Sequence, residues 1–147
     1  LDMAFVHRSI SFRWLTRDSG RTKSRNDAFV EGKANVLASA KRGFEWKGSH
    51  EVSAKAKWPD WRPPQSMRKR RPDLPAFMPG GPNNPLGARA MYLYRGGNDT
   101  LFRLHGTNQP WSIGQAMSSG CVRMMNHDVI DLYARVDVGS KVVVMQA

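Results

Sequence analysis

The sequence has a single cysteine, Cys121, among its 147 residues. One cysteine excludes an intrachain disulfide, so the fold cannot depend on one, and the redox character of the compartment stays open. The histidines are widely spread, and neither a cysteine pair nor a His-Glu-x-x-His-type histidine pair supplies a plausible set of metal ligands. We therefore expect no metal ion in this protein.

Long apolar runs are also missing. No run approaches the roughly 18 residues that would indicate a membrane-spanning helix. The sequence begins Leu1-Asp2-Met3, which is neither an initiator methionine nor a signal peptide with an apolar middle. We expect that the chain has been trimmed or processed and that its targeting information has been removed.

The residues that are present are typical of a globular protein. Hydrophobic residues make up 40% of the chain, with five tryptophans and six phenylalanines, and disordered chains lack such a composition. At 147 residues the chain is long enough to bury most of its apolar surface in one core. A single domain spanning residues 1–147 is therefore expected.

Positive charge dominates the sequence. Lys and Arg number 23 against 12 Asp and Glu, which gives a formal net charge of +11. The densest basic clusters lie at residues 21–25 and 67–72. Such a charge favours an anionic partner by electrostatic steering, and the alternative is a basic surface that is simply solvated.

The local pattern of the chain predicts mostly strands. Residues 4–16 alternate apolar and polar side chains, with the period of two that is typical of a strand. Gly96 and Gly97 lie between two apolar runs and indicate a hairpin. Further short strands are predicted at residues 34–39, 44–54, 88–96, 100–107 and 141–146.

One segment, residues 126–136, has the pattern of a helix, and a brief second helix is expected at 112–117. Asn126 can cap the longer helix at its start, and Asp128 suits its first turn. Apolar side chains at helical spacing predict one buried face. They are Val129, Leu132, Tyr133 and Val136.

Residues 57–87 form a proline-rich excursion that neither a long helix nor a central strand can cross. Its apolar residues, such as Trp58 and Trp61, argue against a flexible linker. We expect an ordered excursion that packs on the core and borders a cleft, because long irregular loops in compact domains are often functional. The alternative is a loop that only covers a face of the sheet.

The residues around Cys121 are compatible with nucleophilic chemistry. A cysteine attacks as its thiolate and needs a lowered pKa or a neighbouring base. His105, at the end of a predicted strand, can come back beside it. Gly120 permits an unusual turn, and the N–H groups of Ser119, Gly120 and Cys121 can point together at a developing oxyanion. The alternative, a buried thiol and an unrelated structural imidazole, stays open on spacing alone.

The stretch "HGTNQPWSIGQAMSSGCVRMMNHDVIDLY" closely resembles the signature of the L,D-transpeptidase (YkuD-like) catalytic domain. That signature is a histidine–glycine pair, a spacer and a Ser/Thr-x-Gly-Cys-x-Arg/Asn segment. The pair His105-Gly106 matches its first part. Ser118, Gly120, Cys121 and Arg123 match its second. The segments "FEWKGSHEVSAKAKWPDW", "GGPNNPLGARAMYL" and "VGSKVVV" also look like the family, so the likeness covers residues 43–147.

The resemblance implies a mainly β, β-sandwich-like fold with one main helix and the long proline-rich excursion. It implies Cys121 as the nucleophile, His105 as its base, and the backbone carbonyl of Gly106 as the group that orients the imidazole. No metal or organic cofactor is implied. The residues that it assigns to substrate binding or loop bracing are Ser118, Arg123, Thr107 and Asn108.

Two departures from the family pattern stand out. Many members have histidine where this chain has Ser119, which cannot serve as a second base, so the proton transfer falls on His105. The family's upstream Thr-Pro-x-Gly segment appears here only as "FVEG", with Gly32 the sole match. Residues 1–42 are therefore divergent, with their register open, and a first pair of strands is one possibility for them.

The implied activity is acyl transfer on peptidoglycan. The cysteine would take a tetrapeptide stem, release D-alanine, and pass the acyl group to an amine to form a 3→3 cross-link. Water as acceptor would give an L,D-carboxypeptidase, and an amine of an outer-membrane protein would anchor that protein to the wall. The resemblance also implies a bacterial periplasmic or cell-wall location and acylation by carbapenem-type β-lactams.

A non-enzymatic alternative belongs to a different class. In a basic nucleic-acid-binding module, Arg and Lys would contact phosphates while Trp58 and Trp61 stack on bases. None of the recognised nucleic-acid-binding motifs appears in the sequence, so nucleic acid is not the expected partner.

Overall fold

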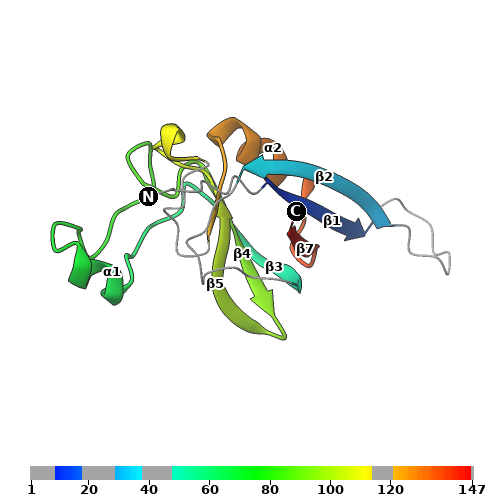
Figure 1. Cartoon of the computed structure of the whole chain (residues 1–147), viewed down its shortest axis with the longest axis horizontal. Helices are drawn as coiled ribbons and strands as arrows, with labels where there is room; N and C mark the ends of the chain where they lie inside the picture. Colours follow the sequence, from blue (N-terminus) through cyan, green and yellow to red (C-terminus); the bar gives the residue numbers. More distant parts are fainter. Residues whose placement is uncertain (1–8, 18–28, 38–47, 114–120, 147) are drawn as a thin grey trace, which may run out of the picture.

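A computed structural model of the chain describes residues 9–17, 29–37, 48–113 and 121–146 (Figure 1). The predicted oxyanion-hole residues Ser119 and Gly120, and Ser118 beside them, lie outside the described residues, as does most of the helix predicted at 112–117. No helix in the described part of the chain is both long and apolar enough to cross a membrane.

The described strands form one curled sheet in the order β2-β1-β7-β3-β4-β5-β6 (Figure 1). All neighbouring strands pair antiparallel except β5 and β6, which run parallel. The prediction of a mainly β fold is therefore confirmed. The strands are β1 (Ser9–Arg17), β2 (Phe29–Leu37), β3 (Gly48–Lys57), β4 (Arg89–Arg95), β5 (Asn98–His105), β6 (Val122–Arg123) and β7 (Lys141–Gln146).

Strands β1 and β2 pair with each other along their whole length, from Ser9↔Leu37 to Arg17↔Phe29. The chain before residue 43 thus contributes a first pair of strands, and β1 joins it to β7. Strand β2 begins at Phe29, earlier than the predicted 34–39. Pairing with β1 overrides the poor strand preference of the Glu, Gly and Lys at 31–33, because β-propensity depends strongly on context.

The hairpin predicted at Gly96 and Gly97 joins β4 to β5. Both glycines have positive φ, 55° and 80°, which is the conformation that a two-residue hairpin turn requires. Further along, the pairing register shifts between Tyr92 and Tyr94, and Leu101 on the opposite strand adopts a left-handed φ of 61°. A β-bulge therefore interrupts β5 just before it reaches His105.

Helix α2 (Asn126–Arg135) packs on β4 and β5 with the face that the sequence predicted. Val129, Leu132 and Val136 are buried, and Tyr133 packs against the same cluster. The predicted cap at Asn126 is wrong, because the N-cap position falls on Met125 and no side chain caps the helix. The sheet residues of this core are Val52, Met91, Leu93, Leu104, Val122 and Val142.

The proline-rich excursion is ordered and contains a short helix, α1 (Gln65–Arg70), that the sequence analysis did not anticipate. In Figure 1, α1 lies at the end of the molecule away from β1 and β2, and none of its residues is buried. Trp61 and Met78 pair through two backbone hydrogen bonds of 2.8 Å. The side-chain amide of Asn84 donates to Met78 O and Pro79 O. Backbone pairing and the Asn84 side chain together therefore hold the excursion, whose only helix in the described residues is the short α1.

Candidate active site

The parallel pair β5–β6 places Arg123 beside the predicted base His105, and the predicted nucleophile Cys121 directly precedes β6. In this pair Leu104 lies beside Val122, and His105 lies beside Arg123. Paired residues point to the same face, and successive residues alternate. Leu104 and Val122 are buried in the core, so His105 and Arg123 occupy the opposite face. Cys121 directly precedes β6, and its Sγ lies 3.7 Å from the carbonyl oxygen of Leu101 in β5, the strand that ends at His105. The charges of Arg103 and Arg123 act on both Cys121 and His105.

The His105 ring is buried and fixed by the backbone that follows it. Only 5% of the residue is exposed, and Nδ1 lies 2.6 Å from the carbonyl oxygen of Gly106. A carbonyl can only accept, so Nδ1 carries the proton and, in the neutral ring, Nε2 keeps the free lone pair. Burial lowers the pKa of His105 to about 4, although the Gly106 carbonyl acts in the opposite direction. At neutral pH the ring is therefore an uncharged base.

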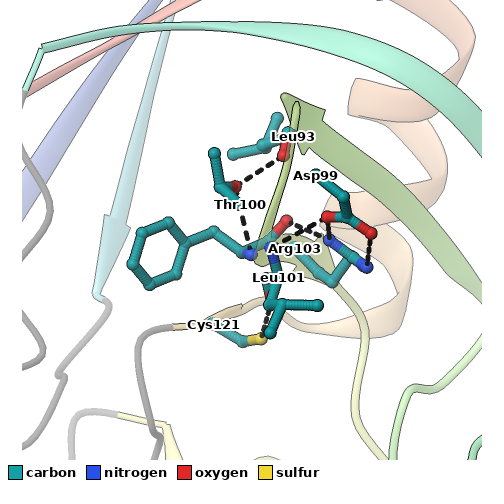
Figure 2. Close-up of polar contacts among 7 residues, drawn as sticks. Leu93, Asp99, Thr100, Leu101, Arg103 and Cys121 are labelled. Atoms are coloured by element: carbon teal, nitrogen blue, oxygen red, sulfur yellow. Dashed lines mark hydrogen bonds and ion pairs between the residues drawn. The ribbon is translucent and has the colours of Figure 1, made fainter. Parts of the chain in front are cut away.

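Cys121 is held more loosely. The residue is half-buried, and its Sγ donates a long hydrogen bond of 3.7 Å to the carbonyl oxygen of Leu101 (Figure 2). Burial raises the pKa of the Cys121 thiol, and the positive charges of Arg103 and Arg123 oppose this effect. The thiol is therefore protonated at neutral pH, with its hydrogen directed at the bulge in β5.

A network of side chains fixes the bulge that receives the thiol (Figure 2). Asp99 pairs with Arg103 through two contacts of 2.7 and 2.8 Å, and the N–H of Leu101 donates to Asp99 Oδ1 at 2.8 Å. Thr100 donates its hydroxyl to Leu93 O and accepts the N–H of Phe102. These bonds hold Leu101 in its left-handed conformation, a strained one for a residue other than glycine.

Arg123 braces the loop that follows His105. Its Nη1 donates to Ser112 Oγ at 2.9 Å, and that hydroxyl donates to the carbonyl of Gln109 at 2.7 Å. The N–H of Gln109 donates to Thr107 Oγ1 at 3.0 Å. Asn108 ties the same loop to the proline-rich excursion through a 2.8 Å bond to Asn83 O. Of the two roles open to Arg123, Thr107 and Asn108, these contacts correspond to bracing.

Two further residues of the site were missed in the sequence analysis, Asn126 and Gly87. Asn126 Oδ1 accepts the N–H of Ala88 at 3.0 Å and that of Thr107 at 3.3 Å. A Cβ at Gly106 would lie 2.1 Å from this oxygen, and a Cβ at Gly87, where φ is +66°, would lie 2.4 Å from it. Both glycines are therefore needed for the backbone to pass so close to Asn126.

Comparison with known proteins gives the class. The family model described as the YkuD L,D-transpeptidase catalytic domain matches residues 6–144, so the chain belongs to this family. The resemblance identified from the sequence is thereby confirmed.

Among relatives, the probable L,D-transpeptidase ErfK/SrfK of Escherichia coli is 41% identical over 95 residues, covering 62% of this chain and 29% of its own. The probable L,D-transpeptidase YbiS of Escherichia coli is 40% identical over 96 residues, covering 63% and 30%. The putative L,D-transpeptidase YqjB of Bacillus subtilis is 33% identical over 119 residues, covering 80% and 61%. The chain thus spans less than a third of the length of ErfK/SrfK and YbiS.

One solved structure is also similar. It is a crystal structure from Brucella melitensis, titled a probable carnitine operon oxidoreductase caia. It is 46% identical in sequence and covers 78% of this chain and 72% of its own, with a TM-score of 0.47.

Proposed function

We propose that this domain is a peptidoglycan L,D-transpeptidase in which Cys121 is the nucleophile and His105 its base. One observation carries the assignment. The chain's one cysteine directly precedes β6, the strand that pairs with the end of β5 at His105, whose ring is uncharged and has its Nδ1 bonded to the Gly106 carbonyl. Membership of the L,D-transpeptidase catalytic-domain family supports the same reaction.

In the first half of the reaction, Cys121 Sγ attacks the carbonyl carbon at the L-centre of diaminopimelate in a tetrapeptide stem. Nε2 of His105 accepts the thiol proton as the C–S bond forms. The bond to the terminal D-alanine breaks, and the leaving amine takes the proton from the imidazolium. A thioester remains on Cys121.

In the second half, an amine of a neighbouring stem attacks the thioester carbonyl. His105 accepts a proton from this amine and returns it to the departing sulfur, so the thiol is restored and a 3→3 cross-link forms. Water in place of the amine would give L,D-carboxypeptidase activity. An amine of an outer-membrane protein would give wall anchoring. All three outcomes use the same acyl-enzyme, and all imply a periplasmic or cell-wall location.

The protonation states support a concerted start to this reaction. Burial raises the pKa of the thiol and lowers that of the imidazole, so both groups are neutral before the attack. The proton must therefore leave sulfur as the new bond forms. Arg103 and Arg123 favour the negative charge that develops on sulfur. The N–H groups of Ser119, Gly120 and Cys121 remain the proposed donors to the oxyanion.

No specific observation favours the nucleic-acid-binding alternative. Trp58 is 44% exposed, whereas Trp61 is partly buried and its backbone is paired with Met78.

Incubation of the protein with a disaccharide-tetrapeptide tests the proposal. The expected products are free D-alanine together with a cross-linked dimer, or with a disaccharide-tripeptide if water is the acceptor. The Cys121→Ala variant should form none of them. As a matched control, Ala134→Ser alters an exposed residue of α2 and should leave the products unchanged. Folded wild-type protein that releases no D-alanine would contradict the proposed reaction.

A further inference from the structure

The peptide unit between Gly106 and Thr107 is bonded on both of its edges. Its carbonyl oxygen lies 2.6 Å from Nδ1 of His105, and its N–H donates to Oδ1 of Asn126 at 3.3 Å. These two groups belong to one rigid plane, because the peptide bond does not rotate freely. A force that fixes the N–H therefore also fixes the direction of the carbonyl that receives the imidazole.

Asn126 is itself anchored on two sides. Its Oδ1 accepts a second N–H, that of Ala88, at 3.0 Å, directly before β4 begins. Its backbone begins α2, which is held to the core through the fully buried Val129. One amide oxygen thus joins the start of the main helix, the approach to β4 and the loop after His105.

Two of the backbone segments that lie beside this oxygen carry glycine, Gly106 and Gly87. Cβ atoms at Gly106 or Gly87 would approach it to 2.1 and 2.4 Å, so either one would force the Asn126 side chain to shift away from its two backbone donors. The N–H of Gly106 is also occupied, donating to Arg89 O at 3.1 Å. The hydrogen bond to Oδ1 of Asn126 is therefore what fixes the orientation of the Gly106–Thr107 peptide on the side opposite His105.

We infer that Asn126 is a positioning residue for the catalytic base: its amide oxygen holds the Gly106–Thr107 peptide so that the Gly106 carbonyl keeps His105 in the Nδ1–H tautomer, with Nε2 free to accept the thiol proton. The inference rests on the proposed function. Both bonds to Asn126 Oδ1 come from backbone N–H groups, so Asn126 acts on His105 through the Gly106–Thr107 peptide.

The chemistry of these contacts separates positioning from general stabilisation. Both partners of Asn126 Oδ1 are backbone donors, so these two bonds need an acceptor at this position. Aspartate keeps an acceptor of the same shape, and alanine removes it. Asn126→Asp should therefore restore most of what Asn126→Ala loses.

The experiment measures acylation by a carbapenem at saturating and subsaturating concentrations, by stopped-flow absorbance and intact-protein mass spectrometry, on protein confirmed as folded by circular dichroism. For Asn126→Ala we expect the maximal acylation rate to fall about tenfold or more, with the half-saturating concentration little changed. The loss should stay below that of His105→Ala, about 10²–10⁴-fold for loss of a general base. Asn98→Ala, at an exposed position directly after the hairpin turn, is the matched control and should react as wild type.

A second measurement does not depend on activity. Nitrogen-15 NMR of the histidine rings should report protonated Nδ1 and unprotonated Nε2 for His105 in the wild type. It should report a mixture of tautomers in Asn126→Ala and the wild-type tautomer in Asn126→Asp.

The outcomes separate the inference from the proposed function. Wild-type protein that forms no carbapenem adduct overturns the proposed function, whatever the variants do. Wild-type protein that acylates normally, together with folded Asn126→Ala of unchanged maximal rate and unchanged His105 tautomer, overturns the inference alone. A rate loss that Asn126→Asp does not restore, with the tautomer unchanged, also overturns it and assigns Asn126 a structural role.

Discussion

The two halves of the proposed catalytic pair are held very differently. His105 is buried and fixed by a 2.6 Å contact to a peptide that is itself bonded on both edges. Cys121 is half-buried, and its thiol has a 3.7 Å contact with Leu101, a residue that is 73% exposed. The base is thus fixed in position, whereas the thiol makes only a long, weak hydrogen bond, because S–H is a weak donor.

The positions of the two residues in the sheet explain this contrast. His105 is the last residue of β5, with Ala90 of β4 on one side and Arg123 of β6 on the other. Cys121 directly precedes β6, a strand of two residues at the end of the described sheet. A residue between two strands has its backbone fixed on both sides, whereas one at the start of a short last strand does not.

The largest expected effect concerns the firmly held residue of the pair, His105. Replacing His105 by alanine removes the base, and acylation of Cys121 by a carbapenem should slow by about 10²–10⁴-fold. The exposed His127 provides the matched control, and His127→Ala should leave the rate unchanged. Stopped-flow absorbance measures both rates. Normal acylation in His105→Ala would show that another residue is the base, and that the rigid position of His105 has no catalytic purpose.

The next effect concerns stability. A methyl group at Gly106 would meet Asn126 Oδ1 at 2.1 Å and Ala88 N at 3.1 Å, so Gly106→Ala should lower the free energy of unfolding by about 3 kcal/mol. Gly96→Ala is the comparison. Nothing lies within 4 Å of its added carbon, and only its φ of +55° is unfavourable, at about 1 kcal/mol. Urea unfolding measures the free energy of unfolding of both variants. Equal decreases would show that a methyl group at Gly106 meets no more resistance than one at Gly96.

The pH dependence of stability tests the burial of the imidazole. The pKa of His105 is about 4 in the folded protein and about 6.5 when unfolded, so the unfolded chain binds more protons between these values. This contribution to stability is complete above pH 6.5 and is lost as the pH falls toward 4, by about 3 kcal/mol. His105→Gln should remove that part of the slope in urea unfolding from pH 4 to 7. An identical slope in both proteins would contradict a buried neutral ring.

The smallest expected effect concerns the pKa of the Cys121 thiol. The charge of Arg103 lowers the thiol pKa against the larger effect of burial, so Arg103→Gln should raise it further. Arg135→Gln, at an exposed position on α2, should leave it where it is. The pH dependence of Cys121 alkylation by iodoacetamide reports the thiol pKa. In the wild type, half-maximal reactivity should lie at a higher pH than for an ordinary exposed thiol, and a plateau near neutral pH would show a thiolate instead.

Much of the fold was predictable because its signals are local. The alternation of apolar and polar residues predicted strand β1, and the paired glycines predicted the β4–β5 hairpin. Apolar residues at helical spacing predicted the buried face of α2. Helix α1 was missed because Pro64 and Pro72 suggested irregular chain, yet proline just before a helix start is well tolerated. Strand β6 was missed because two residues carry no periodic pattern.

The site was predictable only in part. The signature resemblance indicated Cys121, His105 and Gly106, but the contacts of Asn126 join residues far apart in the chain. A local reading of Asn126 predicts a bond to its own helix, as an asparagine at a helix start often makes. In the structure its oxygen instead accepts from Ala88 and Thr107. Only the folded sheet brings those donors to it.

The most direct test of the central claim is mass spectrometry of the protein after incubation with a carbapenem, followed by proteolysis to map the modified residue. We predict one covalent adduct, on the peptide that contains Cys121, and none on Cys121→Ala. A folded wild-type protein that stays unmodified, or an adduct mapped to any other residue, would contradict it.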